Sequence, residues 1–216
     1  MAGRKPLPKR TAADDSSFGR LVPTQARSRE RFERILECSA QLIAEKGSEA
    51  FRISDVVERS KVPFGSLYQY FPDKTAIIGT LAERYNAVGR MCVHQDLLLV
   101  NAVSDLHPAL CRIVDSYYQM FMDEPVMRDI WQATQADRDL QKLDEEDGRF
   151  LAELMAETVR RISPETPASS VETFSQLTMT LIAAVVRHAI ALESAAAKRL
   201  LTLFKDLLPK DLASVR

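Results

Sequence analysis

The residue types most often used in catalysis and metal binding are few in this sequence, and they are scattered. Its three histidines and three cysteines are His94, His107, His188, Cys38, Cys92 and Cys111. Hydrolytic and metal sites need such side chains to converge at short spacing, with Ser, Asp or Glu beside them. The sequence has no CxxC pair and no glycine-rich phosphate loop. We therefore expect no enzyme, no metal site and no cofactor.

The odd number of cysteines favours reduced thiols in the cytoplasm over a disulfide framework. A redox role for Cys92 or Cys111 is the weaker alternative. Residues 1–10 are basic, but no apolar segment follows them, so they are not expected to be a signal peptide. No stretch approaches the roughly 18 uncharged apolar residues that a membrane span requires. We expect a cytoplasmic protein with no membrane partner.

A second set of residues is suited to touching DNA. Residues 65–70 include small, polar and aromatic-polar side chains, which can approach base edges and phosphates without burying an unpaired charge. They lie in the second of two short predicted helices. The aliphatic side chains expected to hold this pair against a preceding helix are Val56, Val57, Val62 and Leu67. Two short helices joined by a tight turn predict a helix-turn-helix at about 53–72.

Local signals define the helices that would position this motif. Apolar and small residues recur every three or four positions in the first helix, as one helical face requires: Phe32, Ile35, Leu36, Ser39, Ala40 and Ile43. Thr24 is its expected N-cap and Gly47 its expected stop. Ser54 can cap the second helix. Pro72 ends the third helix, and Asp73 can cap the helix that begins at residue 74.

The stretch 35–74 resembles the DNA-binding domain of the tetracycline-repressor (TetR) family. The resemblance lies in the segments 45–47, 53–57 and 65–74, and the run Gly-Ser-Leu-Tyr, two residues, Phe, then Lys at 74 is its most specific part. It covers about 50 residues of the 216. The resemblance implies an all-α homodimer whose variable C-terminal domain binds a small ligand and releases operator DNA.

The same resemblance implies roles for individual residues. Ser54 resembles a phosphate-contacting position, and Ser66, Tyr68 and Gln69 resemble positions that face bases and backbone. Tyr70, expected to be exposed, resembles an aromatic residue that lies on a phosphate. The full predicted DNA-binding set is Arg52, Ser54, Phe64, Gly65, Ser66, Tyr68, Gln69, Tyr70 and Lys74.

Two residues depart from the family pattern. Pro63 and Phe64 stand where a capping Ser and a polar or basic residue are usual. Phe64 is either an apolar contact to a thymine methyl group or a buried staple onto the helix pair, and the sequence leaves both open.

The rest of the chain also has a helical pattern, and no segment has the period of a strand. Further helices are expected near 74–100, 107–123, 125–136, 139–162, 168–193 and 195–208, giving about nine in all. The predicted organisation is a basic arm at 1–24, a three-helix DNA-binding domain at 25–74 and a helical ligand-binding and dimerisation domain at 75–216.

The last two long helices have more apolar surface than one core needs, which predicts a homodimer through a four-helix bundle. The residues expected at this interface are Phe174, Thr178, Leu181, Val185, Leu203 and Phe204. The alternative is that these stripes pack inside one subunit.

A ligand pocket is expected among the middle helices, because Met and aromatic side chains tolerate varied apolar ligands. Its predicted lining is Tyr117, Met120, Phe121, Trp131, Phe150, Met155 and His188. The sequence does not identify the small-molecule effector. For each of these residues an ordinary core position is the competing interpretation.

Charge is divided unevenly along the chain. Residues 1–74 hold 14 Lys or Arg and 10 Asp or Glu, a balance of +4, and residues 75–216 hold 15 and 20, a balance of −5. A basic N-terminal third suggests that this end meets a polyanion. The sequence thus predicts a transcriptional repressor that binds double-stranded operator DNA. The alternative is a nucleoid or interaction protein of the same fold that has no small ligand.

Overall fold

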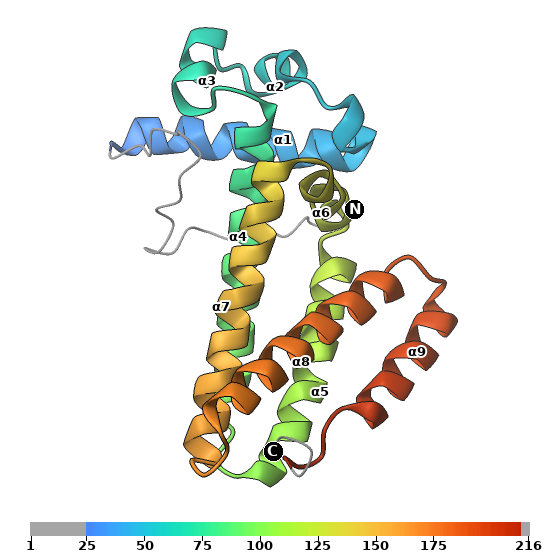
Figure 1. The fold of residues 1–216 in the computed structure, drawn as a ribbon. Coiled ribbons are helices and arrows are strands. Elements are labelled where there is room, and N and C mark those ends of the chain that lie inside the picture. Colours follow the sequence, from blue (N-terminus) through green and yellow to red (C-terminus); the bar gives the residue numbers. More distant parts are fainter. Residues whose placement is uncertain (1–24, 213–216) are drawn as a thin grey trace. The chain divides into compact units, whose positions relative to one another are not determined.

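The structure is a computed structural model that describes residues 25–212. Within that range the secondary structure is entirely helical (Figure 1). The nine helices are α1 (Ala26–Ala50), α2 (Ile53–Ser60), α3 (Phe64–Tyr70), α4 (Lys74–Leu98), α5 (Val103–Asp123), α6 (Val126–Ala136), α7 (Arg138–Ile162), α8 (Ala168–Ala189) and α9 (Ser194–Leu207). The all-α prediction is therefore confirmed. The predicted basic arm at 1–24 and its cap Thr24 lie outside the described residues.

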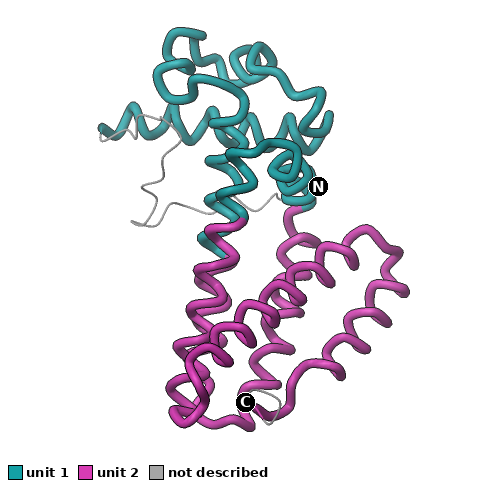
Figure 2. Tube along the Cα trace, viewed as in Figure 1, with its two compact units in different colours: residues 1–88, 125–144 teal, residues 89–124, 145–216 magenta. Residues whose placement is uncertain are grey.

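The chain divides into two compact units (Figure 2). Of the described residues, 25–88 and 125–144 form unit 1, and 89–124 and 145–212 form unit 2. The predicted division followed residue 74, whereas unit 1 also contains the first part of α4, all of α6 and the start of α7. The additional segments are held by packing of α6 against α1. The functions assigned to the two predicted domains stay predictions.

The core of unit 1 is built on the apolar face of α1. Phe32, Ile35, Leu36 and Ile43 are buried, as their spacing predicts. From the other helices, Leu67, Phe71, Ile77 and Leu81 complete the core. One helical face thus provides the surface on which α2, α3 and the start of α4 pack.

Short-range capping explains several helix starts, with one error of prediction. The Asp73 carboxylate accepts a hydrogen bond of 2.7 Å from the backbone N–H of Ala76, which confirms the predicted cap of α4. Asp137 accepts bonds from two backbone N–H groups at the start of α7. The predicted cap at Ser54 is wrong, because α2 begins at Ile53 with Arg52 as its N-cap.

The start of α5 also differs from the prediction, which placed it near 107. Asp105 accepts hydrogen bonds from the backbone N–H groups of Asn101 and Ala102, and α5 therefore begins at Val103. Pro108 consequently lies inside the helix, near its first turn. A carboxylate three residues into a helix can thus outweigh a proline signal that favours a later start.

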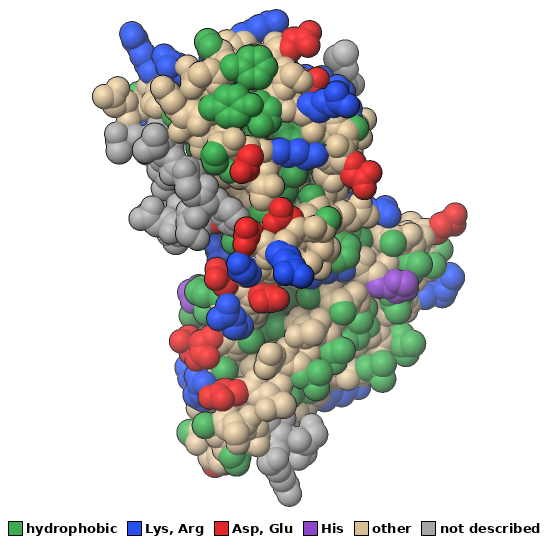
Figure 3. Space-filling view, turned by 45° about the horizontal axis from the view of Figure 1, so that its top comes forward, with side chains coloured by type: hydrophobic (Ala, Val, Ile, Leu, Met, Phe, Trp, Pro, Cys, Tyr) green, Lys and Arg blue, Asp and Glu red, His purple; other side chains and the backbone are tan. Residues whose placement is uncertain are grey.

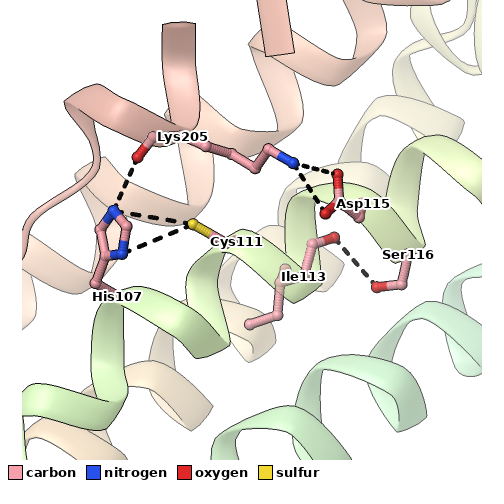
Figure 4. A network of polar contacts seen from close by, with 6 residues as sticks. All are labelled: His107, Cys111, Ile113, Asp115, Ser116 and Lys205. Carbon is pink, nitrogen blue, oxygen red and sulfur yellow. Dashed lines mark hydrogen bonds and ion pairs between the residues drawn. The ribbon is translucent and has the colours of Figure 1, made fainter. Parts of the chain in front are cut away.

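In unit 2, polar contacts connect α5 to α9 (Figure 4). The ring Nε2 of His107 lies 2.9 Å from the backbone oxygen of Lys205, whose ammonium group donates to the Asp115 carboxylate at 2.8 Å. The Sγ atom of Cys111 lies 3.8 Å from Nδ1 of His107. His107 was expected to be isolated from the other histidines and cysteines. It lies four residues before Cys111, and positions four apart on a helix are neighbours.

Gly47 tests how much backbone conformation contributes to unit 1. Its φ of 79° and ψ of 162° lie in a region that is nearly exclusive to glycine. A Cβ atom there would meet its nearest neighbour, Asp129 Oδ1, at 3.9 Å, so the cost of Gly47→Ala is conformational rather than steric. We expect a loss of about 1–3 kcal/mol in the free energy of unfolding, measured by urea denaturation.

The matched control is Gly148→Ala in the interior of α7, where a Cβ atom would meet nothing within 4 Å. This change should stabilise the protein by about 0.5–1 kcal/mol, since alanine is the better helix former. Equal effects at the two glycines would contradict the assignment.

Candidate nucleic-acid interface

The turn between α2 and α3 is tight and internally bonded. Lys61 adopts a left-handed conformation with φ 58° and ends α2 by donating its backbone N–H to Val57 O. The Ser60 hydroxyl accepts a 3.2 Å hydrogen bond from the backbone N–H of Val62. Pro63 then precedes α3 in an extended conformation. Three residues therefore reverse the chain between two short helices, as a helix-turn-helix requires.

The inner side of the motif is apolar and fully packed. Val56, Val62, Leu67 and Phe71 are buried, and Val57 is half-buried. These are the residues predicted to hold the helices against α1, with Phe71 added. Their burial leaves the opposite side of α3 exposed.

The outer side of α3 carries small and polar groups and no charge. Gly65, Tyr68 and Gln69 are exposed and Ser66 is half-buried. A Cβ atom added to Gly65 would meet nothing within 4 Å, so the surface beside it is open. Figure 3 shows hydrophobic side chains on the side of the molecule where Figure 1 places α2 and α3, with Lys and Arg side chains at its edges.

Phe64 belongs to this exposed surface. Its side chain is 49% exposed, and its ring stacks on that of Tyr68, with centroids 6.3 Å apart and an interplanar angle of 20°. Of the two roles that the sequence left open for Phe64, the one that required a buried side chain packed onto the helix pair is therefore wrong.

Tyr70 was predicted to be exposed, but it is buried. It is only 6% exposed, its ring meets Phe32 edge to face at 5.9 Å, and its hydroxyl lies 2.7 Å from the Ser28 hydroxyl. The reason is the packing of α3 on α1, since Phe32 and Ser28 of α1 both contact Tyr70. The exposed tyrosine of α3 is Tyr68, which is 50% exposed.

The remaining predicted residues lie around α3 rather than on it. Arg52 and Ser54 are exposed at the start of α2. Lys74 opens α4, where its ammonium group donates to the backbone oxygen of Glu49 at 3.2 Å and lies 5.9 Å from the ring centroid of Phe51. A cation is thus held at the junction of α1 and α4.

The sequence analysis missed the first turn of α1. Arg27 in this turn and Arg31 in the next are exposed, and the Ser28–Tyr70 contact places the first turn beside the end of α3. The sequence signal for a basic surface is the run Ala-Arg-Ser-Arg-Glu-Arg at 26–31. The prediction used this helix only for its apolar face. These guanidinium groups extend the basic surface next to the recognition helix.

Comparison with known proteins shows which family the chain belongs to. The family model described as "Bacterial regulatory proteins, tetR family" matches residues 35–81, and that described as "Tetracyclin repressor-like, C-terminal domain" matches residues 104–215. The chain belongs to the TetR family. Its α2–α3 pair is accordingly the DNA-binding helix-turn-helix of a transcriptional regulator.

Two curated relatives match part of this TetR-family protein. They are the uncharacterised HTH-type transcriptional regulator YvdT of Bacillus subtilis, 38% identical over 53 residues, and the HTH-type transcriptional repressor KstR of Rhodococcus jostii, 36% identical over 61 residues. The matches cover 24% and 28% of this chain and 27% and 29% of the relatives, so less than a third of either relative is aligned.

Solved structures match most of the chain. A TetR-family regulator from Syntrophomonas wolfei has a TM-score of 0.63 at 19% identity, covering 83% of this chain and 95% of its own. The regulator FadR of B. subtilis, in complex with stearoyl-CoA, has a TM-score of 0.60 at 16% identity, covering 80% and 96%. At these identities the matches establish the fold alone.

The residues predicted for the pocket of this TetR-family chain belong to unit 2, except for Trp131 in unit 1. Tyr117 and Phe121 meet on α5 with ring centroids 5.3 Å apart, and the Tyr117 hydroxyl accepts a 3.2 Å hydrogen bond from Arg187 Nε on α8. Met120 is half-buried beside them, and Met155 on α7 is fully buried.

The other three residues predicted for the pocket differ in unit and in exposure. Trp131 belongs to unit 1, because α6 packs on α1. Phe150 is half exposed under the guanidinium group of Arg90, and His188 is exposed.

The residues predicted for the dimer interface are also divided. Leu181 and Leu203 are exposed, and Phe174, Val185 and Phe204 are half-buried. Thr178 is buried within the protomer, so its availability to a partner was wrongly predicted. It lies on the inward side of α8 together with Val171 and Met179.

Within the part of the chain that the structure describes, no group of three or more His, Cys, Asp or Glu residues could hold a metal ion. The same residues contain no helix long and apolar enough to cross a membrane. Burial raises the pKa of the Cys38, Cys92 and Cys111 thiols above its ordinary value. A raised thiol pKa lowers the thiolate fraction at neutral pH, which disfavours a redox role.

The two tyrosines of α3 make separable predictions. We expect Tyr68→Ala to leave the free energy of unfolding within about 0.5 kcal/mol of wild type, since its side chain is exposed. The same change should weaken operator binding about tenfold through loss of a contact to DNA. Thermal melting and fluorescence anisotropy with labelled DNA measure the two effects.

Tyr70→Ala is the matched variant two residues away. Removing a buried aromatic ring should cost about 3 kcal/mol of stability. An unstable Tyr68→Ala, or a fully stable Tyr70→Ala, would show that the inner and outer sides of α3 have been exchanged.

Proposed function

We propose that this TetR-family protein is a cytoplasmic repressor that binds a palindromic operator as a homodimer and is released by a small, mostly apolar effector. The observation that carries the proposal is the uncharged, open outer side of α3, held outward by the buried residues Leu67, Tyr70 and Phe71. Such a surface can enter a major groove, which is about 12 Å wide and presents distinct groups on each base pair.

Positive side chains around α3 support a DNA partner. Arg27, Arg31, Arg52 and Lys61 are exposed on α1, at the start of α2 and in the turn. Contacts from such groups to phosphates hold the register of the motif, and contacts from α3 to base edges supply sequence preference. Affinity would therefore fall as the salt concentration rises.

A dimer is needed because one helix-turn-helix contacts too few base pairs for a specific site. Unit 2 provides an unusual number of exposed leucines for this purpose. Leu177 and Leu181 are four residues apart on α8, Leu203 and Leu207 are four apart on α9, and all four are 44–73% exposed. Each pair lies on one side of its helix, and α8 packs against α9.

The effector would bind in unit 2. Phe121 and Met120 offer apolar contacts there, and the bonded Tyr117–Arg187 pair offers polar groups that can orient a ligand. The FadR structure of similar fold contains stearoyl-CoA, and a ligand with a long apolar part is the class we propose here.

Release of DNA would depend on α4, since its residues 74–88 belong to unit 1 and 89–98 to unit 2. In unit 1 the nearly buried Arg84 makes two 2.7 Å hydrogen bonds to Glu33 on α1 and lies 5.8 Å from the ring centroid of Phe32. Phe32 in turn stacks on Phe71, which follows α3. An effector acts through this route only if it binds the DNA-incompetent state more tightly.

Selection of random-sequence duplexes with the purified protein tests the function. We expect enrichment of an inverted repeat whose half-sites are about 34 Å apart, and an affinity for it that falls steeply with salt. Salt-dependent binding without any enriched sequence would overturn the repressor proposal in favour of a nucleoid protein. An absence of DNA binding would overturn both.

The dimer is tested by Leu181→Glu, which places a charge on the exposed leucine surface. We expect the variant to sediment as a monomer at micromolar concentration and to lose at least 100-fold in operator affinity, since a single half-site remains. Leu98→Glu is the control, because Leu98 is also an exposed leucine of unit 2 but lies at the end of α4. A wild-type protein that sediments as a monomer would contradict the interface.

A further inference from the structure

Phe64 is the feature of the α3 surface that general DNA binding leaves unexplained. The other phenylalanines of α1–α4, namely Phe32, Phe51 and Phe71, are at most 5% exposed. Phe64 is 49% exposed, although it lies in the same small unit and its phenyl ring has no polar group. A large apolar ring exposed on the outer side of α3 is available for a contact that the isolated chain does not make.

The ring is held in a defined position rather than left loose. Phe64 and Tyr68 lie one helical turn apart, and their rings stack at 6.3 Å. Tyr68 has a phenolic hydroxyl that can bond a phosphate, whereas Phe64 can neither donate nor accept a hydrogen bond. Gly65 beside it has no side chain, so a partner can approach the Phe64 ring closely.

The chemistry of the major groove limits what this ring can recognise. Base edges there present N7, O6, O4 and amino groups, which call for hydrogen-bonding side chains, and one apolar group, the C5-methyl of thymine. A phenyl ring therefore discriminates bases only through that methyl group. Burying both surfaces removes apolar area from water, which is favourable by about 0.8 kcal/mol for each buried methyl or methylene group.

We propose that Phe64 is a specificity-determining residue which packs on the C5-methyl group of a thymine in each operator half-site, with Tyr68 holding the ring in place. The inference rests on the proposed function, since it requires α3 to lie in the major groove. It adds that part of the operator is recognised by a methyl contact in place of a hydrogen bond.

The test begins from an operator selected with the full-length wild-type protein. Each thymine of the half-site is replaced in turn by deoxyuridine, which lacks the methyl group and keeps the same base pairing. We expect one position in each half-site at which the replacement weakens binding about 4-fold, and about 15-fold when both half-sites are changed. An operator with 5-methylcytosine at that position should bind more tightly than the same operator with cytosine there, because the methyl group is restored.

The second arm repeats the series with Phe64→Ala. This variant should bind thymine and deoxyuridine equally at that position, because the group that senses the methyl is gone. Phe64→Leu, which keeps apolar contact, should retain part of the discrimination. Phe150→Ala is the control, since it removes an equally exposed phenylalanine from unit 2 and should leave the wild-type discrimination unchanged.

The outcomes separate this inference from the function on which it rests. A selected operator at which every thymine tolerates deoxyuridine would overturn the role of Phe64 and leave the repressor in place. A Phe64→Ala variant that keeps the full methyl discrimination would overturn it as well. If Phe64→Ala fails to fold, the deoxyuridine series with wild-type protein and with Phe64→Leu still tests whether Phe64 senses the methyl group. An absence of any DNA binding would instead overturn the proposed function.

Discussion

Packing of α3 against α1 through three aromatic rings is the constraint on which the DNA-binding surface depends. Phe32 of α1 stacks on Phe71 at 4.9 Å and meets the edge of Tyr70 at 5.9 Å. Aromatic pairs of this kind contribute about 0.5–1.5 kcal/mol beyond the area that they bury. Because α3 has only seven residues, these contacts and Leu67 determine its rotation about its own axis. The side that faces outward follows from the side that is held.

The same ring cluster connects the recognition helix to α4. The Arg84 guanidinium group contacts Phe32 and binds Glu33 with two hydrogen bonds, while Asp73, two residues after Phe71, caps the start of α4. A bidentate ion pair of a nearly buried arginine has a defined geometry, so it resists sliding of α4 along α1. Any change that displaces α4 in unit 1 must therefore either break this pair or move α1 with it.

Unit 2 has polar contacts between its helices and also exposed apolar side chains. Its helices are connected by the contacts of Lys205 with His107 and Asp115, and of Arg187 with Tyr117. Its exposed leucines on α8 and α9 lie outside this network. A protomer whose internal packing is already satisfied can present apolar surface to a second copy without changing its own fold.

The sequence by itself determined the local structure of this protein. Helix periodicity, Gly47, Pro72 and Asp73 act over a few residues, so the all-α class and the position of the helix-turn-helix could be predicted from them, as could most helix ends. Residues 65–74 also carried enough of the family pattern to indicate a DNA-binding regulator.

Only the tertiary structure decided the burial of several individual residues. Two turns of α3 are too few for periodicity to distinguish Tyr68 from Tyr70, and the Phe32 ring, more than thirty residues away in the chain, makes the choice. Trp131 belongs to unit 1 because α6 packs on α1, a contact between segments far apart in sequence. The burial of Thr178 and the exposure of Phe64 were also decided by tertiary packing, since burial depends on neighbours that no local pattern specifies.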